Sequence, residues 1–502
     1  MRRGAVRVAF VATAVGVMCL LAGALLFPPK SVLRELARHL PWRAAPANPL
    51  ARVAVADRPV AGALRETISV ELERVATHPS TRAAVHNFYR DRGFAPLWTD
   101  GGVVNARAES AIEYLRGVHA DGLDPADYPT PAFQTSADPR GLAVAEVQLT
   151  HSLLRFARDS RGGRIELVKA DRSIGYQFSA PRSADVLAAV SKTSDLKDLL
   201  DSFQPAHAGY RALKTKLAEL RSGTLQREGV LDARRMPPLT FPEDVLIANL
   251  ERWRWMPRDL GQSHVTVNIP DFSLKLVRDG RAVFRANVVV GQPSWATPMM
   301  SSDMTSITVN PVWNVPQTIV EQEFLPMMRS DPSFAKRIGL HIVEREDGGV
   351  RMYQAPGELN VLGRFRFNFP NRFAVYQHDT SEPFLFDLAS RANSHGCIRV
   401  QRAAEYAAAL LSIARPHEEF TPARLRALRG ETEIEIDLGK RIPVHLIYLT
   451  AFVDDGGRLV VRDDIYGHDV RLVRALRRAQ QEIASVNGAP AQSGQARTQP
   501  TR

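Results

Sequence analysis

The chain has almost no cysteine, with only Cys19 and Cys397 among its 502 residues. Cys19 lies in an apolar N-terminal run, so Cys397 has no partner in the rest of the chain, and a fold built on disulfides is excluded. Internal repeats are also absent. The formal net charge of +11 comes from dispersed lysines and arginines, with no basic stripe interleaved with aromatic residues, and we predict no nucleic-acid partner.

Long hydrophobic runs are lacking except near the N-terminus. Residues 8–27 carry no charge and follow Arg2, Arg3 and Arg7. Twenty residues at about 1.5 Å each cover roughly 30 Å, the thickness of a bilayer core, and arginines before such a span place that end in the cytoplasm. We predict an uncleaved signal anchor at residues 1–30; a signal peptide cleaved near Ala22-Gly23-Ala24 is the alternative.

The first half of the remaining chain has the pattern of helices. Residues 31–62 are rich in Ala, Pro and Arg without steady periodicity, and we expect a disordered linker there. Over residues 63–225 apolar residues recur at helical spacing, which predicts an all-α domain with Ser80 and Asn105 as N-caps of two helices.

The pattern changes after a connector at residues 226–261. Val265, Val267 and Ile269 alternate with polar residues, and similar alternation follows, so a mainly β domain is predicted at residues 262–455. The fold class is therefore α+β.

Smaller parts of the second half can also be assigned. Residues 320–328 and 403–413 are expected to be helical, and residues 321–371, long for a connection, to form a cap. We expect residues 456–485 to be a C-terminal extension that packs on the helical domain, and residues 486–502 to be a disordered tail.

The strongest chemical signal is the segment Ser394-His395-Gly396-Cys397-Ile398-Arg399-Val400, with His378 nineteen residues before the cysteine. A nearby imidazole favours the thiolate, which is the nucleophilic form of cysteine. We therefore predict Cys397 as a catalytic nucleophile, ionised at working pH by His378.

Two other interpretations of Cys397 are possible. One is a buried structural cysteine, which the polar residues around it do not favour. The other is a metal site formed by His378, Asp379, His395 and Cys397, whose spacing matches no standard zinc pattern. We predict neither a metal nor an organic cofactor.

With these residues laid out, the chain resembles the L,D-transpeptidases with a YkuD-like catalytic domain. Their signature is a histidine followed by Ser/Thr-His-Gly-Cys and a polar residue two places on, here His378, residues 394–397 and Arg399. Further segments resemble the scaffold-bearing, YcbB-like branch, namely residues 93–98, 122–128, 249–257, 310–316, 356–363, 369–371 and 464–467. The peptidoglycan-binding module usual in that branch does not fit between Leu213 and Asn249, so the chain looks like a trimmed version.

The resemblance implies a helical scaffold domain followed by a YkuD-like β-sandwich or barrel with short helices and a cap. It also implies a periplasmic enzyme, anchored to the inner membrane, with peptidoglycan stem peptides as donor and acceptor. The implied reaction releases D-alanine from a tetrapeptide stem and forms a 3-3 cross-link between two meso-diaminopimelate residues. Carbapenems are expected to acylate the same thiol.

Other functions stay open at this point. Water as acceptor would give an L,D-carboxypeptidase or endopeptidase, and a protein amine would give an enzyme that attaches proteins to peptidoglycan. A function of another class is a non-catalytic scaffold that binds the cell wall. The oligomeric state is not predicted.

The resemblance and the residues together suggest roles around the nucleophile. His378 is expected to act as the base, oriented by either the side chain or the backbone carbonyl of Asp379. The amides of Gly396 and Cys397, with Tyr376 or His395, are expected to stabilise the oxyanion. Substrate binding is assigned to Arg399, Ser394 and Asn360, where Ser394 could instead hold the turn through a backbone hydrogen bond.

Overall fold

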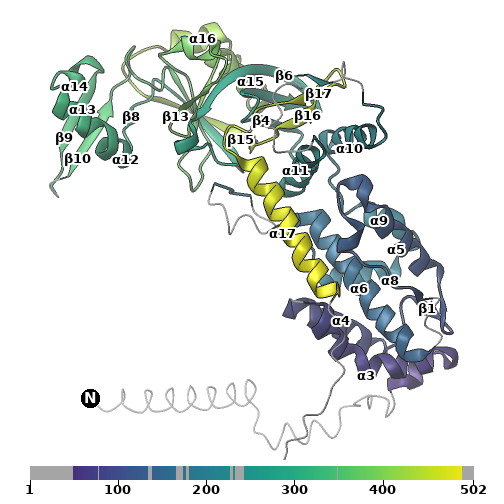
Figure 1. The fold of residues 1–502 in the computed structure, drawn as a ribbon. Helices are drawn as coiled ribbons and strands as arrows, with labels where there is room; N and C mark the ends of the chain where they lie inside the picture. The colour runs from purple at the N-terminus through teal and green to yellow at the C-terminus, as the bar shows by residue number, and fades with distance from the viewer. Residues whose placement is uncertain are drawn as a thin grey trace, which may run out of the picture.

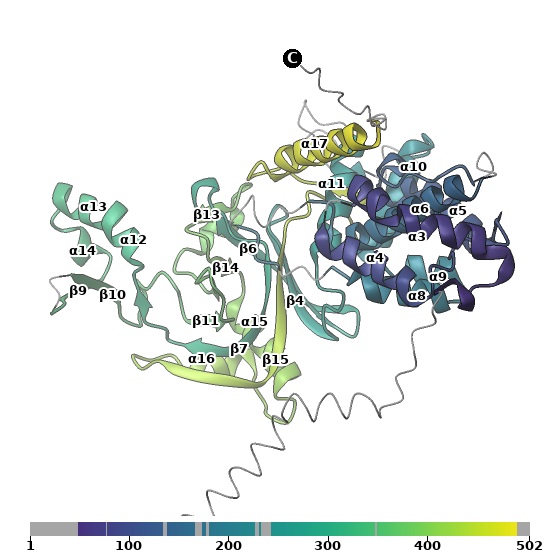
Figure 2. The ribbon, with the colours of Figure 1, turned by 90° about the horizontal axis from the view of Figure 1, so that it is seen from below.

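The computed structural model describes residues 49–76, 78–133, 138–165, 173–176, 180–225, 230–231, 242–346 and 349–488. A helical half and a β-rich half form the two ends of an elongated molecule, and the helices α11 (Pro242–Trp255) and α17 (His468–Gly488) lie where they meet (Figures 1 and 2). The predicted anchor at residues 1–30 and residues 489–502 of the predicted tail lie outside the described residues. Residues 486–488, which were also assigned to that tail, belong instead to the helix α17. No helix within those residues is long and apolar enough to cross a membrane.

The helical half is built around α6 (Pro139–Gly162). This helix begins at Asp138, whose carboxylate accepts the amides of Arg140 and Gly141 at 2.7 and 2.9 Å, and a proline occupies its first position. Buried residues follow one another along nearly its whole length. Around it lie α3 (Arg58–Val75), α4 (Pro79–Asp91), α5 (Ala106–Gly117), α8 (Ser183–Lys192) and α9 (Leu196–Asp201). The helix α10 (Ala208–Arg221) instead shares a core with α11 and residues 451–461.

Short elements complete this half. They are the 3-10 turns η1 (Pro49–Arg52), η2 (Val55–Asp57), η3 (Val118–Asp121) and η4 (Pro125–Asp127), and the hairpin of β1 (Thr99–Asp100) and β2 (Val103–Val104).

Two sequence expectations need correction here, and one is confirmed. The linker expected up to residue 62 ends earlier, because α3 already begins at Arg58 and buries Val60 and Ala61. The N-cap of α4 is His78 and not Ser80, since the His78 ring accepts the Ser80 amide. Asn105 does cap α5, with its side-chain oxygen 3.0 Å from the Ala108 amide.

The β-rich half is a closed barrel. Its strands run in the order β6-β14-β12-β11-β7-β15-β4-β5, and β5 pairs back with β6, while β13 pairs in parallel with the last two residues of β6, Val290 and Gly291. Val265, Val267 and Ile269 are fully buried, as their alternation predicts. The strands are β4 (Ser263–Asn268), β5 (Ser273–Arg278), β6 (Arg281–Gly291), β7 (Met300–Val309), β11 (Phe365–Asn368), β12 (Gln377–His378), β13 (Ala392–Ser394), β14 (Ile398–Val400) and β15 (Ile434–Ile447).

Helices and a small sheet surround the barrel. The expected helix at residues 403–413 is α15 (Ala403–Ala414), which buries Tyr406, Leu410 and Leu411 against the barrel core. The other elements are η8 (Pro293–Trp295), η10 (Pro383–Asp387), α16 (Pro422–Ala427) and the sheet of β16 (Ala451–Val453), β17 (Leu459–Val461) and β3 (Val230–Leu231).

A cap projects from the barrel on the side away from the scaffold (Figure 2). It has its own hydrophobic core, which includes Trp313, Phe324 and Met352. The cap starts at β8, whereas β11 within the range expected for it pairs inside the barrel. Its elements are β8 (Trp313–Asn314), α12 (Gln317–Ile319), the π-helical turn η9 (Val320–Phe324), α13 (Leu325–Ser330), α14 (Phe334–Arg337), β9 (Leu340–Glu344) and β10 (Val350–Gln354).

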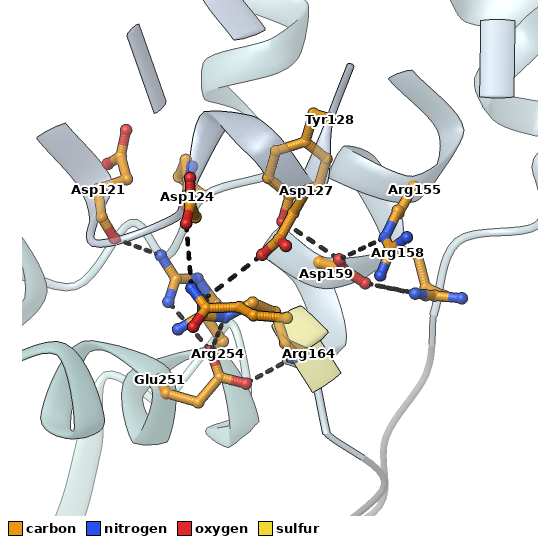
Figure 3. Close-up of polar contacts among 12 residues, drawn as sticks. Asp121, Asp124, Asp127, Tyr128, Arg155, Arg158, Asp159, Arg164, Glu251 and Arg254 are labelled. Atoms are coloured by element: carbon orange, nitrogen blue, oxygen red, sulfur yellow. Dashed lines mark hydrogen bonds and ion pairs between the residues drawn. The ribbon is translucent and has the colours of Figure 1, made fainter. Parts of the chain in front are cut away.

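Buried charges on α11 join the two halves. Glu251 and Arg254 have fully buried side chains; Glu251 pairs with Arg164 at 3.3 Å, and Arg254 donates to the Asp121 carbonyl at 2.6 Å (Figure 3). On another side of the same helix, Arg252 pairs with Asp469 of α17 at 2.5 Å. Because a buried charge without its partner costs several kcal/mol, roughly 3–5, this network fixes how the scaffold meets the barrel.

Candidate active site

The predicted base, His378, ends the strand β12, and the predicted nucleophile, Cys397, immediately precedes the adjacent parallel strand β14. In β12 and β14, Gln377 is paired with Ile398 and His378 with Arg399. Alternate residues of a strand point to the same face, and paired residues share a face. Tyr376, His378, Cys397 and Arg399 therefore lie on one face. Ile398 is buried in the barrel core on the other.

Cys397 is a free, half-buried cysteine. The side chain of Tyr376 lies beside its sulfur and also near Trp313 of the cap. Burial is the main cause that raises the pKa of the Cys397 thiol to about 11, and the contacts with Tyr376 and the charge of Arg399 offset it only in part.

His378 is buried and is held by backbone. Its Nδ1 lies 2.5 Å from the carbonyl oxygen of Asp379, so this carbonyl is the orienting group, and the carboxylate of Asp379 instead accepts the Arg364 amide at 2.9 Å. The backbone of Asp379 and, second to it, that of Leu362 act to raise the pKa of the ring. An imidazole that donates through Nδ1 keeps Nε2 as a proton acceptor. Burial, helped by the charge of Arg399, lowers the pKa of His378 to about 3.

These pKa shifts correct the ionisation expected from sequence. A thiol with a pKa near 11 and an imidazole with a pKa near 3 are both neutral at pH 7. The thiolate–imidazolium pair is disfavoured because both charged forms lose their hydration in this site. The resting nucleophile is therefore the thiol, and its proton has to leave while it attacks.

This state predicts a particular pH dependence of Cys397 alkylation. The rate with iodoacetamide is expected to rise about tenfold per pH unit from pH 7 to pH 10 without a plateau, because a raised pKa keeps the reactive thiolate a minor species below about 11. Peptide mapping by mass spectrometry follows Cys397 separately from Cys19. A plateau between pH 6 and 8 would contradict the neutral resting pair.

The turn before Cys397 is shaped by Ser394. Its hydroxyl donates to the Cys397 carbonyl at 2.6 Å and accepts the Gly396 amide at 3.2 Å. Gly396 has a φ of 103°, a conformation that favours glycine. Ser394 thus occupies the Gly396 amide. The Cys397 amide has no hydrogen-bond partner in the described part of the chain, so it is the backbone donor that remains free next to the sulfur.

Three residues that sequence reasoning missed hold this turn from behind. Thr297 donates its hydroxyl to the Gly396 carbonyl at 2.8 Å and accepts the Gly291 amide at 2.9 Å. The Tyr466 hydroxyl donates to the Gly291 carbonyl at 2.6 Å and accepts the Thr297 amide at 3.2 Å. The segment at residues 464–467 was a sequence signal for Tyr466, but nothing in the sequence connected it to the cysteine turn.

The remaining predicted site residues are engaged by other groups. His395 pairs through Nε2 with Glu323 of the cap at 2.6 Å, which favours a role in holding the cap over one in the oxyanion site. Arg399 pairs with Glu382 at 2.5 Å, so a substrate carboxylate would compete with Glu382 for this guanidinium group. Asn360 is buried, and its amide donates to the Pro311 carbonyl at 2.8 Å and accepts from Leu362 at 2.9 Å. Asn360 thus supports the loop that contacts His378.

The residues that the structure describes contain no group of three His, Cys, Asp or Glu side chains arranged to hold a metal ion.

Two regions of the chain match known protein families. Residues 83–217 match the Scaffold domain, and residues 262–436 match the L,D-transpeptidase catalytic domain, YkuD. The second match contains the cap, the cysteine turn and His378. The chain therefore carries an L,D-transpeptidase catalytic domain of the YkuD family, preceded by a Scaffold domain, and the resemblance seen in the sequence is confirmed.

Individual proteins similar to this chain are also known. A Haemophilus influenzae protein provisionally named an L,D-transpeptidase is 28% identical over 402 residues, which cover 76% of this chain and 77% of the relative. Among solved structures, the chain is similar to an L,D-transpeptidase from Mycobacterium smegmatis (13% identity, 37% of this chain, 58% of that chain, TM-score 0.18). It is also similar to L,D-transpeptidase 3 from Mycobacterium tuberculosis (14% identity, 37% of this chain, 60% of that chain, TM-score 0.18). The chain spans less than two thirds of either structure.

Proposed function

We propose that this chain is a peptidoglycan L,D-transpeptidase that acts outside the cytoplasm and forms 3-3 cross-links between meso-diaminopimelate residues. The donor is a tetrapeptide stem and the acceptor is the side-chain amine of a second stem. The observation that carries the proposal is the placement of Cys397, Tyr376 and His378 on one face of two paired strands, within a domain of the YkuD family.

The first half of the reaction acylates the enzyme. The Cys397 sulfur attacks the donor carbonyl as its proton passes to Nε2 of His378, and the carbonyl π electrons move onto the oxygen. The Cys397 amide and the Tyr376 hydroxyl stabilise this oxyanion, and each donor lowers the activation free energy by about 3 kcal/mol. The tetrahedral intermediate then collapses to a thioester, and the C–N bond to D-alanine breaks as its amine takes the proton from His378.

The second half transfers the acyl group. The acceptor amine attacks the thioester and gives a proton to His378, and collapse of the second tetrahedral intermediate breaks the C–S bond. The sulfur recovers its proton from His378, so the neutral pair is restored. Water in place of the amine would give the L,D-carboxypeptidase reaction with the same residues.

The test is the identity of the product. Purified protein incubated with disaccharide-tetrapeptides is expected to release D-alanine and to give a dimer whose 3-3 link is identified by tandem mass spectrometry. Prior treatment with a carbapenem is expected to block the reaction and to add its mass to Cys397. Tripeptide product without any dimer would support the hydrolytic alternative, and transfer only to a protein amine would support the attachment alternative.

A further inference from the structure

A cavity of about 440 Å³ lies at the junction of the scaffold and the barrel, away from the cysteine. The ends of α6, α8 and α9 form its scaffold side, and the segment from Trp255 to Arg258, which leads out of α11, forms the other. Apolar side chains line it, among them Val186, Phe203 and Met256. This size and lining are those of sites that bind small organic ligands.

The charges at this cavity are unbalanced. Arg161 lines it and has no hydrogen-bond or ion-pair partner in the part of the chain that the structure describes. Arg258 donates to the backbone carbonyls of Phe203 and Gln204 but pairs with no carboxylate of the described residues. The carboxylate of Asp185 also lines the cavity, but it forms an ion pair with Arg182 at 2.7 Å. Two guanidinium groups are thus left without a counter-charge beside apolar surface.

The electrostatics of Arg258 agree with this geometry. Its pKa is lowered to about 10, first by burial and then by the charge of Arg161. A bound anion would relieve this repulsion, and the guanidinium group of Arg161 can bind a carboxylate with two parallel hydrogen bonds. The apolar lining adds a preference for an alkyl group next to the carboxylate. A free inorganic anion would leave that lining unused.

We propose that this junction cavity binds the carboxylate end of a second peptide stem and holds the polymer beside the enzyme while the cysteine site reacts. The identity of the ligand rests on the proposed function, because stem peptides end in a carboxylate next to a methyl group. The site itself is independent of the chemistry at Cys397, since none of its lining residues belongs to the cysteine face.

The test measures binding without turnover. The full chain with Cys397→Ala is titrated with a disaccharide-tetrapeptide by calorimetry, and two sites are expected, one at each location. Arg161→Glu, which reverses an exposed charge, and Ala189→Phe, which fills the cavity from α8, are each expected to weaken one of the two sites at least tenfold. Arg90→Glu is the matched control, because Arg90 is an exposed arginine of α4 outside the cavity, and it is expected to leave both sites unchanged.

Several outcomes would overturn the proposal. The first is a single binding site in the Cys397→Ala chain, and the second is two sites of unchanged affinity in both cavity variants. The third is binding of anionic phospholipid vesicles that depends on Arg161 while binding of the tetrapeptide does not depend on it. Thermal unfolding identifies a misfolded variant, and because Arg161 is exposed, its variant remains informative if Ala189→Phe fails to fold. Since binding is measured in a chain that cannot turn over, absence of 3-3 products in the separate assay does not decide this result.

Discussion

Replacing His378 by glutamine is expected to lower kcat by about 10⁴-fold, a loss at the upper end of general-base effects. The reason is the neutral resting pair: with a thiol pKa of about 11, roughly one molecule in 10⁴ carries a thiolate at pH 7 without a base. The initial rate of dimer formation measures the loss. The residual activity of the variant should rise with pH, because hydroxide then supplies the missing deprotonation.

His264→Gln is the matched control for this variant. His264 is partly buried and, like His378, bonds through Nδ1 to a backbone carbonyl, that of Gly261 at 2.8 Å, but it lies on β4 and not beside the cysteine. Its kcat is expected to stay within about twofold of the parent. A His378→Gln enzyme with nearly full activity at pH 7 would contradict the proton transfer proposed for this site.

The second large effect is expected from Gly291→Ala. A Cβ atom at Gly291 would lie 1.9 Å from the Trp295 carbonyl oxygen and 3.0 Å from the Gly396 Cα, both of them backbone atoms that cannot rotate away. The backbone must therefore move, at an expected cost of about 3 kcal/mol in the free energy of unfolding. Because Gly291 contacts the cysteine turn directly, activity should fall more than stability alone explains.

Urea denaturation and dimer formation measure the two effects separately. Gly357→Ala serves as the control, since a Cβ there meets no atom within 4 Å, and it is expected to change the unfolding free energy by less than about 0.5 kcal/mol. Full activity in folded Gly291→Ala protein would show that the turn tolerates a shift of this backbone.

The catalytic residues could be predicted from the sequence better than the contacts between them. Cys397 and His378 could be found because an isolated thiol within a polar glycine turn is unusual, and the alternation at Val265, Val267 and Ile269 identified strands because one face of each is buried. The choice between the side chain and the carbonyl of Asp379 could not be made, since both belong to one residue and the fold alone decides which of them faces the imidazole.

Other features depend on contacts between distant segments, which local patterns do not encode. The neutral resting state of the cysteine and histidine arises from burial by the surrounding structure, and the pairing of His395 with Glu323 spans 72 positions. Ser80 was predicted as the cap because serine is the more usual N-cap. In the structure, the ring of His78, two residues earlier, accepts the hydrogen bond that caps the helix.

The Tyr466 hydrogen bonds also bear on where the molecule can be divided. The matched catalytic region ends at residue 436, inside β15 and thirty residues before Tyr466. A fragment cut at that limit would lose most of a barrel strand and the hydroxyl that braces Gly291 and Thr297. The smallest unit suited to recombinant study of the reaction therefore extends through α17, whose Asp469 also neutralises Arg252 of α11.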